Sequence, residues 1–200
     1  KQFSRLDEAV ANLKRVKANL KRYKASVLKA AVEGRLAETD GASKDLYDRS
    51  NWIQIGHVIQ SLDQGWSPQC ENEPRSSDLQ WAVMKTTAVQ PMQFLVDENK
   101  RLTPELTPRE HLELVDGDLL ITRAGPRNRV GITCLVRTSA LRLMLCDKAY
   151  RLRAKLDLAL PAYLEVVLNS PTLLDSLDEM KSGISDSGLN LTQKRFTELS

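Results

Sequence analysis

The chain has 200 residues, of which 42% are hydrophobic and 28% are charged, and its formal net charge is +3. This apolar content is enough for a folded core, and the length suits one domain of ordinary size plus an appendage. No apolar run approaches the roughly 18 residues that cross a bilayer, and the basic start has no apolar signal-peptide core. We therefore expect no membrane segment and no membrane partner.

Residues 1–36 predict a long helix. They contain no proline, one glycine and many good helix formers. At 1.5 Å per residue the helix would be roughly 50 Å long. Its apolar side chains recur every three or four residues, which is the period of a helix and not of a strand. These side chains are Phe3, Leu6, Val10, Leu13, Val16, Leu20, Tyr23, Val27 and Ala30.

A narrow apolar stripe on so long a helix favours pairing with a second helix along its whole length, as in a coiled coil. The residues expected to form this seam are Leu6, Val10, Leu13, Val16, Leu20, Tyr23 and Val27. A helix that lies on its own domain is the simpler alternative.

The charge of the chain is unevenly distributed. Residues 1–36 carry a net charge of +7, so residues 37–200 carry −4. A basic helix can approach a polyanion or an acidic partner surface. A solvated helix face would show the same pattern, so charge alone does not separate the two.

Residues 38–50 are polar, and we interpret them as a linker between the helix at residues 1–37 and a domain at residues 51–200. In this domain strands are expected at residues 52–55, 79–84, 118–122, 130–136, 141–146 and 149–153. Helices are expected at residues 96–101, 163–169 and 171–181, with a last short helix capped by Thr192 after a loop at residues 182–190. These elements predict a mixed α/β (α+β) fold with a small twisted sheet. No internal repeat is recognised.

The cysteines Cys70, Cys134 and Cys146 are far apart and odd in number. This predicts free thiols in a reducing compartment and a cytoplasmic location. With only His57 and His111 available, no metal-ligand spacing can be built, so no metal site is expected.

Catalytic motifs are missing from the sequence. It has no glycine-rich phosphate loop and no serine nucleophile elbow. Asp116 and Asp118 flank Gly117, and we interpret them as a structural turn and not as an acid–base pair. A protein that is not an enzyme, and that has no cofactor, is therefore expected. A perturbed acid or base in a deep pocket would favour the alternative of an enzyme.

Two loops carry side chains that suit nucleic acid. One covers residues 66–76, and the other covers residues 123–129, just after a predicted strand. Arginine reads guanine edges and binds phosphates, and asparagine pairs with adenine edges. A solvated surface loop is the alternative for each. The candidate DNA-binding residues are Trp66, Ser67, Gln69, Arg75, Arg123, Arg127, Asn128, Arg129 and Lys194.

Several segments resemble one known family. Residues 10–36, VANLKRVKANLKRYKASVLKAAVEGRL, resemble the conserved spacer helix of type I restriction–modification specificity subunits. The matching segments of the domain are WIQIGHV at residues 52–58, GWSP at 65–68, GDLLITRAG at 117–125, Val130-Gly131, the helix at 163–169, SGI at 182–184 and LNL at 189–191. The resemblance covers nearly the whole chain and is more specific in the helix than in the domain.

The resemblance implies a target recognition domain that binds one half of a split target in double-stranded DNA, and a helix that sets the distance to the other half. It implies three protein partners: the modification (methyltransferase) subunit, the restriction (motor and nuclease) subunit, and a second spacer helix. That second helix belongs either to the same full-length subunit or to another copy in a homodimer. Since the family's full subunit has two such domains and two such helices, we expect a half subunit or a fragment.

A protein-interaction module is the competing interpretation. In it the helix is an assembly arm and the domain does not read DNA directly. An acidic partner for the helix, together with a domain that does not bind DNA, would favour this alternative.

Overall fold

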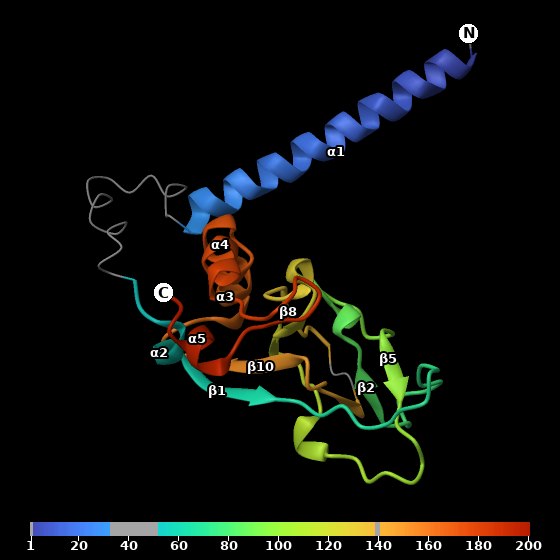
Figure 1. Cartoon of the computed structure of the whole chain (residues 1–200), viewed down its shortest axis with the longest axis vertical. Helices are drawn as coiled ribbons and strands as arrows, with labels where there is room; N and C mark the ends of the chain where they lie inside the picture. Colours follow the sequence, from blue (N-terminus) through green and yellow to red (C-terminus); the bar gives the residue numbers. More distant parts are fainter. Residues whose placement is uncertain (1, 33–51, 139–140) are drawn as a thin grey trace. The chain divides into compact units, whose positions relative to one another are not determined.

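The computed structural model describes residues 2–32, 52–138 and 141–200 (Figure 1). The fold is mixed α/β, as predicted: a long N-terminal helix, and a domain of small sheets and short helices. The chain divides into two compact units, which are described separately, the first containing the long helix and the second containing the sheets. The expected linker at residues 38–50 and the predicted helix end near Leu36 lie outside the described residues.

The first unit contains α1 (Gln2–Val32), which confirms the predicted long helix. Arg15 donates to the side chain of Asn12 over 3.0 Å, and Arg22 donates to that of Asn19 over 2.5 Å. This recurrence reflects a seven-residue repeat, ANLKRVK at residues 11–17 followed by ANLKRYK at 18–24, so the expectation of no internal repeat is wrong. A heptad is the repeat of a coiled coil and supports the interpretation of the apolar stripe.

The centre of the second unit is a four-stranded antiparallel sheet in the order β1-β10-β6-β8. Its strands are β1 (Ile59–Gln64), β6 (Leu119–Thr122), β8 (Thr133–Leu135) and β10 (Ala149–Ala154). All four residues of β6 are buried because the sheet is covered on both faces. A strand covered on both faces is typically a continuous apolar run and not an alternation of apolar and polar residues. The run LLIT at residues 119–122 therefore predicted β6 well.

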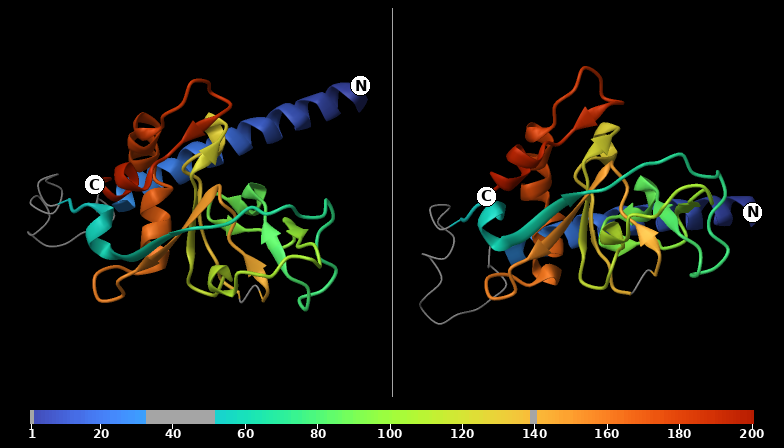
Figure 2. Two further views of the ribbon diagram at one scale, coloured as in Figure 1. Left: turned by 60° about the horizontal axis from the view of Figure 1, so that its bottom comes forward. Right: turned by 90° about the horizontal axis from the view of Figure 1, so that it is seen from below.

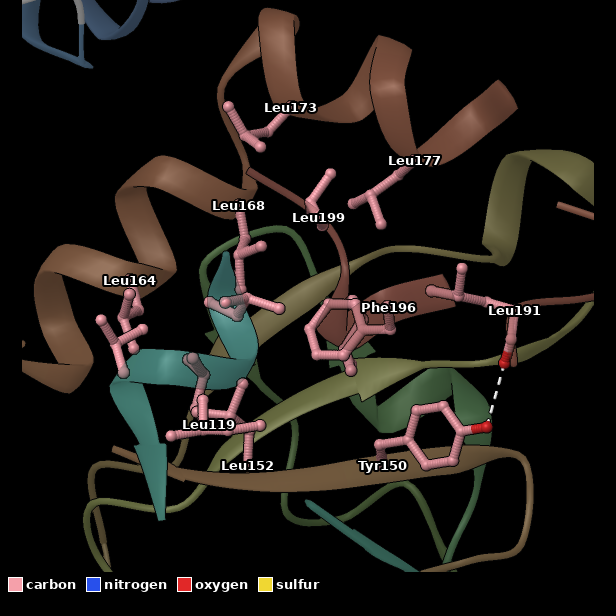
Figure 3. Packing of buried hydrophobic residues seen from close by; sticks show 14 of the residues in the cluster. Leu119, Tyr150, Leu152, Leu164, Leu168, Leu173, Leu177, Leu191, Phe196 and Leu199 are labelled. Carbon is pink, nitrogen blue, oxygen red and sulfur yellow. Dashed lines mark hydrogen bonds between the residues drawn. The ribbon is translucent and has the colours of Figure 1, made fainter. Parts of the chain in front are cut away.

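Helices cover one face of this sheet (Figure 2). They are α2 (Ile55–Val58), α3 (Pro161–Leu168), α4 (Pro171–Met180) and α5 (Gln193–Thr197). Figure 3 shows Leu119 and Leu152 of the sheet facing Phe196 of α5, while the Tyr150 hydroxyl donates to the carbonyl of Leu191 over 3.0 Å. The buried hydroxyl thus keeps a hydrogen bond, as buried polar groups generally do.

The other face packs against a smaller sheet in the order β5-β2-β9. Its strands are β2 (Ala82–Met84), β5 (Asn99–Arg101) and β9 (Leu143–Met144). β9 pairs with β2 in parallel and β5 pairs with β2 antiparallel. The side chain of Leu120 enters this second core, because consecutive strand residues point to opposite faces.

Short elements complete the domain. The strand pairs are β3 (Val89–Gln90) with β4 (Gln93–Phe94), and β7 (Ala124–Gly125) with β11 (Leu189–Asn190). Single 3-10 turns are η3 (Thr86–Ala88), η4 (Glu110–Leu112) and η5 (Arg127–Arg129). The loop expected at residues 182–190 therefore ends in a short strand, which pairs within the expected loop at residues 123–129.

The outer edge of β8 is closed by α3. Glu165 is fully buried, accepts a hydrogen bond from the N–H of Leu135 over 2.7 Å, and pairs with Arg137. The Asn169 side chain donates to the carbonyl of Thr133 over 3.0 Å. These side chains occupy backbone groups that an edge strand would otherwise leave unpaired.

Two predicted elements are wrong. The strand expected at residues 52–55 is absent: Ile55 begins α2, and its N–H donates to the carbonyl of Leu199 near the end of the chain over 2.7 Å. The helix expected at residues 96–101 is replaced by a turn, in which the Asn99 amide donates to the carbonyl of Val96 over 2.9 Å, and by β5, which pairs with the distant strand β2. In both places tertiary contacts override local preference.

Other predicted strands exist but are shorter. β2 and β9 occupy only part of residues 79–84 and 141–146, and β8 begins at Thr133 and not at Val130. Gly131 has a φ of +92°, which interrupts an extended strand before Thr133.

Candidate nucleic-acid interface

The loop after β1 packs onto the segment between β9 and β10. Gly65 lies so close to the carbonyl of Leu145 that a Cβ atom would clash with it. The N–H of Trp66 donates to this carbonyl over 3.0 Å, and the Ser67 hydroxyl donates to the Asp147 carboxylate over 2.5 Å. The approach of this loop to Asp147 therefore depends on a residue without a side chain.

Arg123 reaches the same segment from the end of β6. Its backbone N–H donates to the carbonyl of Lys148 over 2.9 Å, and its Nε donates to the carbonyl of Asp147 over 2.8 Å. Its guanidinium carbon lies 5.5 Å from the centroid of the Tyr150 ring, within cation–π range. The two loops selected from the sequence are thus joined through the Asp147–Lys148 turn.

Arg127 and Arg129 use their guanidinium groups within the protein. Arg127 pairs with Asp178 over 2.7 Å and with Asp186 over 3.0 Å, and these hydrogen bonds raise the pKa of its guanidinium. The pKa of Asp178 is lowered, mainly by its hydrogen bond from Lys181 and also by Arg127. Arg129 donates to the carbonyl of Val89 over 2.8 Å. These contacts fix the shape of the basic loop.

In the first loop, at residues 66–76, some candidate side chains are also bound within the protein while others are exposed. The Arg75 side chain is only 6% exposed and pairs with Asp78 over 2.7 Å, so it holds the loop together. Gln69 is exposed. Trp66 is half-buried, with the guanidinium carbon of Arg109 4.3 Å from its ring centroid.

The two remaining candidates are exposed. Asn128 lies in η5, and Lys194 lies in α5. Leu191, three residues before Lys194, donates its N–H to the carbonyl of Arg123 over 2.8 Å, which places the start of α5 beside the basic loop. The N-cap predicted for α5 is confirmed, because the N–H of Arg195 donates to the Thr192 hydroxyl over 3.3 Å.

Sequence reasoning missed Arg109, Asp147 and Lys148. The signal available for the last two was a polar pair between two predicted strands, at residues 141–146 and 149–153, which is typical of a turn. Nothing local in the sequence indicates that this turn meets both loops, because the contacts span 24 to 80 residues.

The predicted seam of α1 is exposed on the helix. Leu6, Leu13, Leu20 and Tyr23 are each more than 60% exposed, Val10 and Val16 are also exposed, and Val27 is half-buried. Isolated exposed apolar residues are ordinary, but a stripe of them along one long helix is typical of an interaction surface.

The thiols do not form a reactive centre. All three cysteines are free, and burial raises the pKa of Cys134 to about 12 and that of Cys146 to about 11.

Within residues 2–32, 52–138 and 141–200 no group of three or more His, Cys, Asp or Glu side chains could hold a metal ion. Asp118 is a structural residue: it is buried and its carboxylate accepts from Arg153 over 2.9 Å. Among the described residues, no helix is long and apolar enough to cross a membrane.

Comparison with known proteins identifies a curated relative and solved structures that are similar to this chain. The type I restriction enzyme EcoEI specificity subunit of Escherichia coli is 42% identical over 145 residues, which are 72% of this chain. The chain spans about a quarter (24%) of the length of that relative. No family model matches.

Solved structures of the same kind are more distant. The HsdS subunit of Thermoanaerobacter tengcongensis matches 96% of this chain and 41% of its own, with a TM-score of 0.51 and 17% identity, which supports the same fold. The S subunit of a type I restriction-modification system from M. genitalium matches 74% of this chain and 32% of its own, with a TM-score of 0.44 and 12% identity. On the strength of the 42% identical relative, the chain belongs to the family of type I restriction enzyme specificity subunits.

Proposed function

We propose that this chain is the part of a specificity subunit that binds one half of a bipartite target in double-stranded DNA. The observation that carries the proposal is the 42% identity over 72% of the chain with a type I specificity subunit. The junction of two polar loops at the Asp147–Lys148 turn supports it, since base recognition requires several side chains on one surface.

In this proposal α1 is the assembly element and sets the distance between two recognition domains. Its exposed apolar stripe pairs with a second spacer helix, either of the same full-length subunit or of a second copy, which would make the target symmetric. The modification and restriction subunits bind to the resulting complex in the cytoplasm. The chain itself is non-catalytic, and methylation and cleavage belong to those subunits.

The net charge of the domain at residues 52–200, which is −2 from 17 Lys and Arg against 19 Asp and Glu, favours one alternative, a protein-interaction module that does not contact DNA. An acidic domain binds DNA weakly by itself unless basic side chains are concentrated on one surface. The experiment below separates the two functions, because only a DNA-reading domain changes which sequence is methylated.

The test is reconstitution of the chain with the modification subunit of its own system, followed by mapping of methylated sites on plasmid DNA. We expect methylation at one split sequence, and a different sequence after exchange of residues 52–200 for the domain of another specificity subunit. Methylation that does not change on this exchange would contradict DNA reading by the domain. A chain that does not bind the modification subunit would contradict the assembly role.

A further inference from the structure

Three lysines from distant parts of the sequence meet at one edge of the β5-β2-β9 sheet. Because β2 and β9 are parallel, the segments that follow them, which carry Lys85 and Lys148, emerge on the same side. β5 runs antiparallel to β2, and Lys100 is the register partner of Val83. The topology therefore collects Lys85, Lys100 and Lys148 around one hollow.

This hollow has a volume of about 310 Å³, and its lining includes the three lysines with Ser67, Thr86 and Asp147. Two carboxylates oppose the lysines. Asp147 accepts the hydroxyl of Ser67 over 2.5 Å, and Glu98 lies 3.6 Å from the Nζ of Lys85. The pKa of Glu98 is lowered, mainly by its hydrogen bond from Thr87 and also by Lys85.

The charge of the hollow remains positive. Within the described part of the chain, neither Lys100 nor Lys148 has a carboxylate oxygen within 4.0 Å. The domain at residues 52–200 has 17 Lys and Arg against 19 Asp and Glu, a net charge of −2, so without these three lysines it carries −5. A local concentration of positive charge on an acidic body is the place where a polyanion is attracted most strongly.

The hollow adjoins both loops of the candidate interface. Ser67 belongs to the first loop and lines the hollow, while the backbone of Lys148 holds Arg123 of the second loop. Arg129 donates to the carbonyl of Thr86, another lining residue, over 2.7 Å. A strand of nucleic acid whose bases meet Arg123 would therefore bring its backbone close to the lysines.

We propose that this hollow binds backbone phosphates of duplex DNA through Lys85, Lys100 and Lys148. These are positioning residues: phosphate contacts fix the register of a protein on the duplex but carry no sequence information. The inference rests on the proposed DNA-binding function and adds to it a division of roles between lysines that hold the backbone and Arg123 that reads bases.

The first test is acetylation footprinting of the full chain with a short mixed-sequence duplex at low salt, read by mass spectrometry. Lys85, Lys100 and Lys148 should be protected by the duplex, and Lys155 should not. Lys155 is a matched control, because it directly follows β10 whereas Lys148 directly precedes it. The two therefore lie roughly 20 Å apart at opposite ends of a six-residue strand.

The second test is the salt dependence of binding to the same duplex. Substitution of both Lys100→Gln and Lys148→Gln should lower the slope of log K against log salt by about 2, since each phosphate contact contributes about 0.9. Lys155→Gln should leave the slope unchanged. Circular dichroism of the double variant establishes that the loss is not unfolding.

The outcomes separate this inference from the proposed function. Duplex binding with no protection of the three lysines and no change in slope would overturn the phosphate site and leave DNA binding intact. No duplex binding at any salt concentration would overturn both. Equal protection by inorganic phosphate at the same phosphate concentration would identify a small-anion site and overturn the assignment to duplex DNA.

Discussion

The arginines of the recognition domain differ in how many of their donors are used inside the protein. Arg127 and Arg129 each contact two or more protein oxygens, and their guanidinium groups brace neighbouring segments. Among the described contacts the Arg123 guanidinium pairs with no carboxylate: its Nε donates to the carbonyl of Asp147, and the group also interacts with the side chain of Tyr150. Base reading by arginine uses a pair of its donors, and a guanidinium without a carboxylate partner can turn them to an external acceptor more readily.

This difference predicts distinct effects of alanine substitutions. Arg123→Ala should reduce the preference for cognate over scrambled DNA by about 1–3 kcal/mol, the range for one bidentate base contact. Arg127→Ala should instead lower stability, because Asp178 and Asp186 lose their partner. The measurements are competition binding with the reconstituted complex and urea denaturation. An unchanged preference in Arg123→Ala would remove this residue from base reading.

Glu165 gives a second prediction at this scale. It is fully buried, accepts a hydrogen bond from the N–H of Leu135 and forms an ion pair with the guanidinium of Arg137. Glu165→Ala leaves a backbone donor unsatisfied, and the free energy of unfolding should fall by about 1–3 kcal/mol. Glu165→Gln retains an acceptor and should cost less. Glu179→Ala, on an exposed face of α4, is the control and should stay within about 0.5 kcal/mol of the parent. Equal urea midpoints for Glu165→Ala and Glu179→Ala would contradict this role.

At the scale of elements, the sequence predicted the helices and strands whose formation depends on their own residues. β6 has a continuous apolar run, β10 alternates Tyr150 and Leu152 with two arginines, and α3 and α4 each begin with a proline. β5 and α2 were not predicted correctly, because partners distant in sequence decide them: β5 pairs with β2, and Ile55 bonds to Leu199.

In the candidate interface too, the contacts between segments distant in sequence could not be predicted from the sequence. Sequence reasoning identified the two loops as polar, exposed candidates, but it did not indicate that they join at the Asp147–Lys148 turn. Parallel pairing of β2 with β9 brings the lysines together, and a pairing between strands about 60 residues apart has no local signal. Which arginines are used internally depends equally on distant carboxylates and carbonyls.

Gly65 allows a test of the loop as an element. A Cβ atom there would clash with the backbone of Leu145, which cannot move without disturbing β9. Gly65→Ala should destabilise the domain by about 1–3 kcal/mol through overpacking and should weaken DNA binding by displacing Ser67 from Asp147. Gly188→Ala is the matched control, since a Cβ atom there meets only the Ser185 hydroxyl at 3.8 Å. Thermal melting and binding are measured together, and a Gly65→Ala variant that matches Gly188→Ala in both would show that close approach at Gly65 is unnecessary.

At the scale of the whole molecule, charge and apolar surface assign different tasks to the two units. Residues 1–36 carry +7 and an apolar stripe that includes a seven-residue repeat, whereas residues 52–200 carry −2, from 17 Lys and Arg against 19 Asp and Glu, and have three lysines around one hollow. An apolar stripe binds another helix, and a basic hollow on an acidic domain binds a polyanion only locally. The combination suits a protein whose assembly and ligand binding are carried by separate units.

The assembly task predicts the effect of substitutions in the stripe. Leu13 and Leu20 are each more than 60% exposed and occupy equivalent positions in the seven-residue repeat. Burial of one leucine in a helix pair contributes about 1.5–3 kcal/mol, so Leu13→Asp with Leu20→Asp should weaken self-association by at least about 100-fold. Light scattering of the purified chain, with and without the modification subunit, measures this directly.

A control is available on the same helix. Lys14→Gln with Lys21→Gln makes the same change in net charge at the neighbouring positions of the repeat, outside the stripe. If α1 pairs through the stripe, the leucine variant should be a monomer while the lysine variant dimerises like the parent. If both variants lose association equally, the contact is electrostatic, and the basic face of α1 and not its apolar stripe is the assembly surface. If the parent is itself a monomer that gains a partner only when the modification subunit is added, α1 pairs with that subunit or with the second helix of a longer chain, and homodimerisation is excluded.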